Sequence, residues 1–109
     1  MPLSIQTRIA SGVVIVAVSG RLCFLEVALL ACVKDLLAAG HREFVLNLAD
    51  VPYIDSFGLG QLITIWTSIR NQSGQMTLVR PTDHVRRLFE ITRLDSVFYL
   101  AAQEVPAAD

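Results

Sequence analysis

The sequence predicts an α/β fold in one domain, with the element order ββαβαβαβ. Two strand-like segments stand together at the N-terminal end, and after them segments with helix and strand patterns alternate. Such alternation needs crossover connections, so the sheet should be mixed and mostly parallel, with the opening hairpin as its antiparallel edge. The 109 residues hold no repeat or linker, and residues 1–109 are therefore expected to form a single domain.

The opening hairpin is predicted from residues 3–7 and 13–18. In the first segment apolar or β-branched residues alternate with polar ones, and the second is rich in Val and Ile. Ser11-Gly12 between them suits a short turn, and Gly20 ends the second strand.

A helix is predicted over residues 24–39. This segment is rich in strong helix formers, and Gly40 stands where a C-terminal cap belongs. At about 100° per residue, three apolar and two charged side chains share one side: Glu26, Leu30, Val33, Lys34 and Leu37. Either neighbouring elements bury this side within the monomer, or it docks a kinase or a second copy of the chain as a homo-oligomer.

A central strand and a second helix follow. Residues 44–48 form a short apolar run with β-branched content, which is typical of a strand buried on both faces. After Ser56, apolar residues recur at helical spacing as far as position 69, with polar residues on the other face. Ser73-Gly74 is expected to stop this helix.

The C-terminal part completes the alternation. Residues 76–79 predict a strand, and Pro81-Thr82-Asp83 starts a helix. The side chains of this helix expected to face inward are Val85, Leu88 and Phe89. Residues 97–100 predict a last short strand.

Composition excludes several classes of partner. Nine basic and ten acidic side chains leave a net charge of −1, without the basic surface that nucleic acid or an anionic membrane attracts. The longest early apolar run, residues 13–18, is too short for a signal peptide or a membrane span, so we expect a cytoplasmic protein without direct membrane insertion. Apolar residues make up 53% of the chain and charged ones 17%, which suggests surface meant for a protein partner.

Neither a metal nor a cofactor is predicted. Cys23 and Cys32 would point to nearly opposite sides of one helix, so we expect reduced core thiols instead of a disulfide or a shared metal. Gly58-x-Gly60 lacks the third glycine of a dinucleotide loop, and no Gly-Lys-Ser/Thr follows it.

The stretch YIDSFGLGQL, residues 53–62, places Asp55 and Ser56 where the central strand passes into the second helix. Functional groups collect at such crossings, and the first turn of a helix stabilises a nearby anion by roughly 0.3 to 1 kcal/mol. Either the two residues only cap the helix, or they form a chemical switch that uses the same electrostatics. Gly58 and Gly60 clear space around Ser56 for another chain or a phosphoryl donor.

The ordered set of motifs resembles the STAS family, the domains of bacterial anti-sigma factor antagonists and sulfate-transporter tails. The family's order is an apolar strand, Asp55-Ser56-x-Gly58-Leu59-Gly60, a helix, a strand, and Pro81-x-x-x-Val85-x-x-Leu88-Phe89. Two further stretches also look like that family: Gly20-Arg21-Leu22 and Val45-Leu46-Asn47-Leu48. The resemblance covers nearly the whole chain.

The resemblance implies a partner switch. In the family's antagonists, the serine that matches Ser56 is phosphorylated by an anti-sigma factor that is also a serine kinase, and a serine phosphatase resets it. The unmodified form binds the kinase and frees a sigma factor. A phosphoryl group would bring about two negative charges beside Asp55 and repel a partner that had accommodated the neutral hydroxyl. The expected contact residues surround the serine: Leu22, Cys23, Asp55, Phe57, Gly58, Leu59 and Gly60.

Two positions depart from the family pattern and suggest alternatives. Phe57 is bulky where the antagonists usually have a small polar residue, a feature also seen in the family's stressosome scaffold branch. Cys23 stands where the family often has an aspartate. The runner-up functions are a stressosome-type scaffold and the cytosolic STAS partner of a lipid transporter.

A serine hydrolase is a remote alternative from another class. Ser56 would need a base, and the only histidines are His41, just past a helix end, and His84, at a helix start. The Gly-x-Ser-x-Gly elbow is missing from the sequence. The sequence therefore predicts a binding module and not an enzyme.

Overall fold

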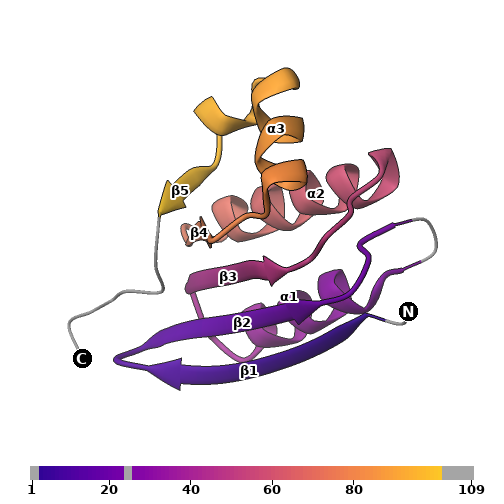
Figure 1. Cartoon of the computed structure of the whole chain (residues 1–109). Coiled ribbons are helices and arrows are strands. Elements are labelled where there is room, and N and C mark those ends of the chain that lie inside the picture. Colours follow the sequence, from indigo (N-terminus) through magenta and orange to yellow (C-terminus); the bar gives the residue numbers. More distant parts are fainter. Residues whose placement is uncertain (1–2, 24–25, 102–109) are drawn as a thin grey trace.

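A computed structural model describes residues 3–23 and 26–101 as a five-stranded sheet with three helices (Figure 1). The strands are β1 (Ser4–Ala10), β2 (Val13–Ser19), β3 (Glu43–Asp50), β4 (Gln75–Val79) and β5 (Tyr99–Ala101). The helices are α1 (Ala28–Ala38), α2 (Ser56–Asn71) and α3 (Asp83–Ile91), with a 3-10 turn at Leu94–Ser96.

The strands lie side by side in the same order as in the chain. β1 is antiparallel to β2, and every later neighbour pair is parallel. Crossovers of one hand that advance in one direction place their helices on the same face of a sheet. The α/β class, the order ββαβαβαβ and the mixed, mostly parallel sheet are thus confirmed.

The β1–β2 turn contains only two residues, since Ala10 pairs with Val13. These residues, Ser11 and Gly12, have φ angles of 51° and 79°. Positive φ at both positions is the geometry of a type I′ turn, whose twist matches that of the flanking strands. The short turn predicted at Ser11-Gly12 is thus confirmed, and it sets the register of the hairpin.

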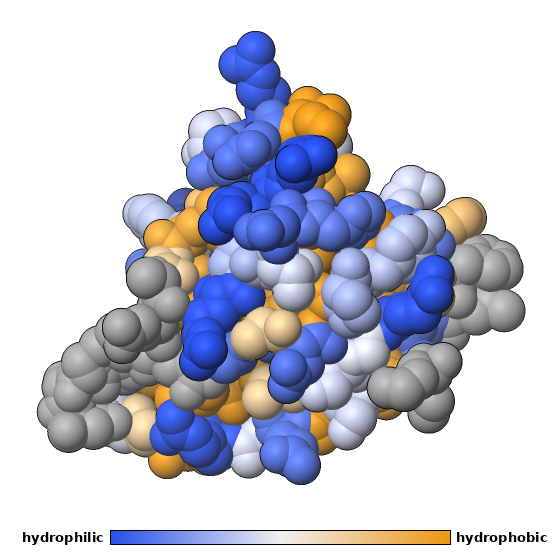
Figure 2. All heavy atoms as spheres, viewed as in Figure 1, coloured by the Kyte–Doolittle hydropathy of each residue, from blue (hydrophilic) through white to orange (hydrophobic). Residues whose placement is uncertain are grey.

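One face of the sheet packs against all three helices and forms the main core. Buried side chains alternate along the strands, and each helix adds an apolar stripe. The helix contributions are Leu29, Val33 and Leu37 of α1, Leu62, Ile65 and Ile69 of α2, and Val85 and Phe89 of α3. Hydrophilic residues predominate over α3 in the space-filling view, in keeping with a helix that is apolar on one side only (Figure 2).

The other face of the sheet holds a second, smaller cluster. Ile15, Val45 and Val79 are buried there. Val45 and Leu46 are neighbours on β3 that point to opposite faces, and both are buried. The prediction of a central strand buried on both faces is confirmed.

α1 is shorter than the predicted helix over residues 24–39. Glu26 and Val27 are not helical, and residues 24 and 25 lie outside the described part of the chain. Val27 occupies the N-cap position, where its apolar side chain makes no capping hydrogen bond. Helix-forming composition continues past this point, but a helix begins where its first amides find partners, and composition alone does not locate that residue.

The C-terminal end of α1 agrees with the sequence. Gly40 has φ of 104°, its N–H donates to Leu37 O at 3.0 Å, and His41 N–H donates to Leu36 O at 3.1 Å. This pair of bonds is a Schellman motif, which satisfies the last carbonyls of a helix and favours glycine in the left-handed position.

The side of α1 for which both burial and docking were considered belongs largely to the core. Val33 is 0% exposed, Leu37 is 3% exposed, and Leu30 is half-buried. The buried stripe also runs through Leu29, which the helical wheel did not place on this side. Of the two interpretations, burial within the monomer is the one that Val33 and Leu37 support.

The last strand begins two residues later than predicted, at Tyr99. Phe98, just before it, is 3% exposed and packs edge-on against Trp66 and Phe89, with ring centroids 6.5 and 5.6 Å apart. The inward-pointing aromatic residue thus anchors the segment before β5, and only the next three residues pair with β4.

Candidate functional site

The segments that follow β2 and β3 pair with each other at the carboxyl edge of the sheet. Leu22 and Ile54 form an isolated parallel bridge there. Leu22 N–H donates to Tyr53 O at 3.1 Å, and Asp55 N–H donates to Leu22 O at 3.3 Å. These bonds hold the loop after β2 beside the first turn of α2.

Asp55 caps α2. Its backbone is extended, with φ of −99° and ψ of −174°, and its Oδ1 accepts a hydrogen bond from Gly58 N–H at 2.9 Å. Its carbonyl oxygen also accepts from Leu59 N–H at 2.9 Å. Asp55 is therefore the N-cap, and Ser56 is the first helical residue. The capping role considered for either residue belongs to Asp55, which leaves the Ser56 side chain for other chemistry.

Ser56 and Phe57 are exposed at the start of α2. The Phe57 side chain is 60% exposed, and Ser56 beside it also faces solvent. A hydroxyl on the first helical residue lies in the positive field of the helix end, where an added negative charge is stabilised. The site therefore joins an exposed hydroxyl to an aromatic side chain of the type that anchors protein interfaces.

The two glycines of the motif have different roles. A Cβ at Gly58 would lie 2.1 Å from Leu22 O, so only glycine lets α2 approach the loop after β2 this closely. A Cβ at Gly60 would meet no atom within 4 Å, and this position is exposed. Gly58 therefore makes room for the protein's own backbone, whereas Gly60 leaves open surface beside the serine.

Some of the expected contact residues lie inside the molecule. Leu22 is 0% exposed and Gly58 is buried, so in this structure they support the loop and offer no side-chain contact to a partner. Leu59 is half-buried and packs against the core. Cys23 is half-buried, with its Sγ 3.9 Å from Arg21 O. Sequence position alone could not separate supporting residues from accessible ones.

A stack of side chains next to the site escaped the sequence analysis. The Arg21 guanidinium carbon lies 4.5 Å from the centroid of the Tyr53 ring, and the His84 ring stacks on the same tyrosine at 5.4 Å and 20°. Thr82 Oγ1 also donates to Val51 O at 2.9 Å. These contacts join the loops after β2 and β3 to the start of α3. The three segments are distant in sequence, so no local pattern signals the stack.

The cysteines are less buried than expected, since both Cys23 and Cys32 are half-buried free thiols. Burial raises the pKa of the Cys32 thiol, and nearby Asp35 raises it further. The protonated, weakly reactive form of Cys32 is thereby favoured. Within residues 3–23 and 26–101, no three His, Cys, Asp or Glu side chains gather in a group able to hold a metal ion.

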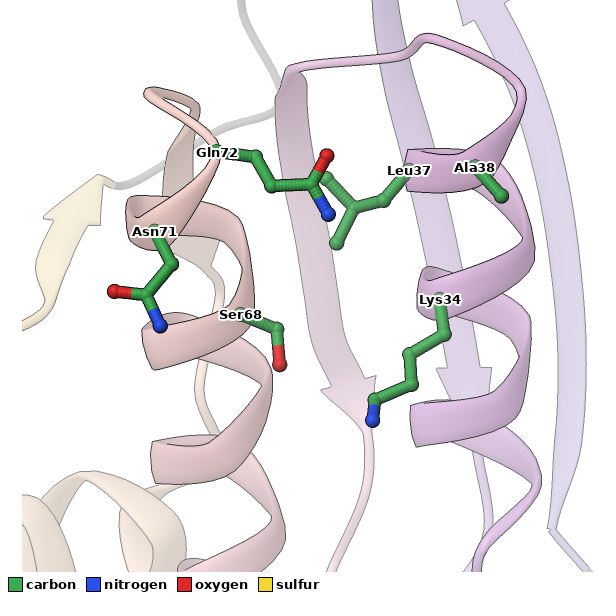
Figure 3. A pocket seen from close by; sticks show the side chains of 6 residues that line it. All are labelled: Lys34, Leu37, Ala38, Ser68, Asn71 and Gln72. Atoms are coloured by element: carbon green, nitrogen blue, oxygen red, sulfur yellow. The ribbon is translucent and has the colours of Figure 1, made fainter.

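A groove lies between the C-terminal halves of α1 and α2 (Figure 3). Its volume is about 340 Å³, and the residues that line it are Lys34, Leu37, Ala38, Ser68, Asn71 and Gln72. Asn71 ends the helix that Ser56 begins, which puts the groove about 20 Å from the serine at 1.5 Å rise per residue. The groove is therefore separate from the carboxyl edge of the sheet.

Comparison with known proteins identifies the family. A family model of the STAS domain matches residues 4–107. This chain belongs to the STAS domain family. The family resemblance noted in the sequence is thus confirmed over nearly the whole chain. No helix in the described part of the STAS domain is long and apolar enough to cross a membrane.

Relatives of this STAS domain are named for one role. A "Putative anti-sigma factor antagonist" of Thermotoga maritima is 38% identical over 63 residues, which cover 58% of this chain and 56% of that protein. The BtrV protein of Bordetella bronchiseptica, named in the same way, is 35% identical over 69 residues, 63% of this chain and 60% of its own. These matches span less than two thirds of either relative.

A solved structure extends the likeness to nearly the whole domain. The crystal structure of the Thermotoga maritima antagonist superposes with a TM-score of 0.82 at 33% identity, covering 95% of this chain and 90% of that one. The fold is therefore shared with that protein over nearly the whole of this chain.

Proposed function

We propose that this STAS domain is an anti-sigma factor antagonist, and that phosphorylation of Ser56 in the cytoplasm switches its binding to an anti-sigma factor. The observation that carries the proposal is that the two polar residues at the start of α2 have different roles. Asp55 caps the helix, so the Ser56 hydroxyl is exposed on the first helical residue beside an exposed Phe57. The names of the relatives support the antagonist role.

The contact surface lies at the starts of α1 and α2. Phe57 and Val27 are 60% and 62% exposed and supply apolar contact area, while Gly60 lets a partner's backbone approach closely. The Gln61 side-chain amide donates to Glu26 O and ties the segment before α1 to α2. The segments that carry Val27 and Phe57 are thus held together by a hydrogen bond.

The switch works through charge. Transfer of the γ-phosphoryl group of ATP to Ser56 Oγ forms one O–P bond and releases ADP and a proton, and a phosphatase reverses the change by hydrolysis. The phosphate adds about two negative charges next to Asp55. A partner surface that fits a neutral hydroxyl must then face three negative charges, and such like-charge contacts cost several kcal/mol. The domain itself acts by binding and performs no catalysis in this scheme.

The proposal is tested with a candidate anti-sigma factor that has serine kinase activity. The kinase and ATP are incubated with wild type, with Ser56→Ala, and with Thr67→Ala, which removes another exposed hydroxyl from the same helix. We expect intact mass to show one phosphoryl group on wild type and Thr67→Ala and none on Ser56→Ala. Ser56→Glu should weaken binding to the kinase by at least about tenfold, or 1.4 kcal/mol.

Equal modification of the Ser56→Ala variant would contradict the site. A wild type that gains no phosphoryl group but forms large assemblies of its own would instead favour the stressosome-type scaffold, for which the exposed Phe57 is also suited. Light scattering measures the size of such assemblies, and Phe57→Ser should then dissociate them by removing an apolar contact.

A further inference from the structure

Arg21 carries a positive charge that has no acceptor within the described part of the molecule. Its guanidinium rests on the face of Tyr53, and no hydrogen bond or ion pair joins it to a described residue. The acid on the neighbouring first turn of α3, Asp83, is already paired with Arg86 at 2.6 Å. A cation stacked on an aromatic ring keeps its edge N–H donors available for an oxyanion.

Backbone pairing brings this cation to the start of α2. Leu22 and Ile54 are bridge partners, so their backbones lie about 4.8 Å apart. Both are buried, and the alternation of side chains along paired segments turns Arg21 and Tyr53 to the opposite, outer side. Ser56 lies only two residues beyond Ile54, at most about 7 Å along the chain.

Two backbone amides of the first turn of α2 are already engaged by its cap residue. The Asp55 carboxylate already accepts from Gly58 N–H, and the Asp55 carbonyl accepts from Leu59 N–H. The same carboxylate is a like charge beside the phosphate. A cation from another element would therefore add to the stabilisation of a doubly charged phosphate at this position, and Arg21 is on the loop that contacts this turn.

We infer that Arg21, supported by Tyr53, is the residue that receives the phosphoryl group of modified Ser56. This inference rests on the proposed phosphorylation of Ser56. Planar guanidinium donors match two phosphate oxygens at once. In the unmodified protein the Arg21 guanidinium stacks on the Tyr53 ring. In the modified protein it binds the phosphate on Ser56 and so links the start of α2 to the loop after β2.

The test places phosphoserine at position 56 during translation, so that no kinase is needed. The second ionisation of the phosphate is followed by phosphorus NMR in three proteins: the Ser56-phosphorylated domain, its Arg21→Gln variant, and its Arg87→Gln variant. Arg87 is an exposed arginine of α3 and serves as the matched control. Asp55 and His84 are present in all three proteins, so their charges are common to the comparison.

Because an adjacent cation favours the doubly charged phosphate, its pKa should be lowest when Arg21 is present. We expect Arg21→Gln to raise the phosphate pKa by about 0.3 to 0.7 units, the scale of an exposed charge pair, and Arg87→Gln to change it by less than about 0.1. Tyr53→Leu should raise it by an intermediate amount, since the arginine loses its support. Near 1 M salt the difference should largely disappear.

Equal phosphate pKa values in the Arg21→Gln and Arg87→Gln proteins would overturn the inference. This outcome is distinct from failure of the proposed function. The kinase assay can show modification of Ser56 whether or not Arg21 binds the phosphate, and the titration can show the pair whether or not a kinase is found.

Discussion

At the scale of single residues, the carbonyl oxygen of Leu22 shapes the candidate site. It accepts a hydrogen bond from Asp55 N–H, and it lies where a Cβ on Gly58 would be 2.1 Å away. One backbone atom thus holds the cap of α2 and requires a glycine in the first turn. The sequence motif drew attention to this glycine. Only the packed structure shows that it makes room for the protein's own backbone and not for a binding partner.

The two glycines of α2 provide a matched pair of variants. Gly58→Ala should lower the free energy of unfolding by about 2 kcal/mol or more, because the new Cβ meets backbone that cannot rotate away. Gly60→Ala should raise it by about 0.5 to 1 kcal/mol, since alanine is the better helix former and its Cβ enters open space. Urea unfolding followed by circular dichroism measures both. Similar effects of the two substitutions would show that the α2 contact with Leu22 is looser than described.

At the scale of the element, a small rotation of α1 about its axis changes which of its side chains are buried. Its buried stripe is Leu29, Val33 and Leu37, whereas the wheel drawn from sequence centred on Leu30 and Val33. A helix rich in Leu and Ala has apolar residues on most sides, so periodicity alone gives no sharp direction. The sheet and α2 decide the direction by covering one side.

Truncations on α1 test this assignment. Leu29→Ala should lower the free energy of unfolding by about 2 to 4 kcal/mol, because Leu29 is 0% exposed and its truncation leaves a cavity in the core. Leu30→Ala, at the half-buried neighbour, should cost about 1 kcal/mol or less. Denaturant midpoints at constant m-value provide the comparison. A larger loss for Leu30→Ala would restore the sequence-based orientation of the helix.

At the scale of the whole molecule, stability and function are divided across the sheet. β3 has a parallel partner on each side and buried side chains on both faces, whereas β5 has three exposed residues and β4 as its neighbour in the sheet. The proposed switch lies at the carboxyl edge, at the start of α2 and on the loop after β2, next to the well-buried strands β2 and β3. The proposed modification site is thus supported by the most deeply buried part of the sheet.

Amide hydrogen exchange should reveal this gradient. We expect the amides of β3 to exchange only through global unfolding, and those of β5 to exchange through local opening that costs several kcal/mol less. Two-dimensional NMR in deuterated buffer, at a pH where intrinsic exchange is slow, resolves the two strands. Protection of β5 equal to that of β3 would mean that this edge unfolds only with the rest of the domain.

The sequence alone determined the order of the elements, the turn at Ser11-Gly12, the end of α1 at Gly40 and the position of the serine at the start of α2. These features follow from local backbone preferences and from the period of apolar residues, both of which are properties of neighbours along the chain. The family followed from the same ordered motifs.

Tertiary structure alone decided which side of α1 is interior, that Gly58 makes room for a backbone oxygen, and that Arg21 and His84 meet on Tyr53. Each of these depends on distances between segments that are far apart in sequence. Parallel pairing of β2, β3 and β4 sets those distances, because it brings the carboxyl ends of the three strands to one edge of the sheet. The pattern of neighbouring residues along the chain does not specify these distances.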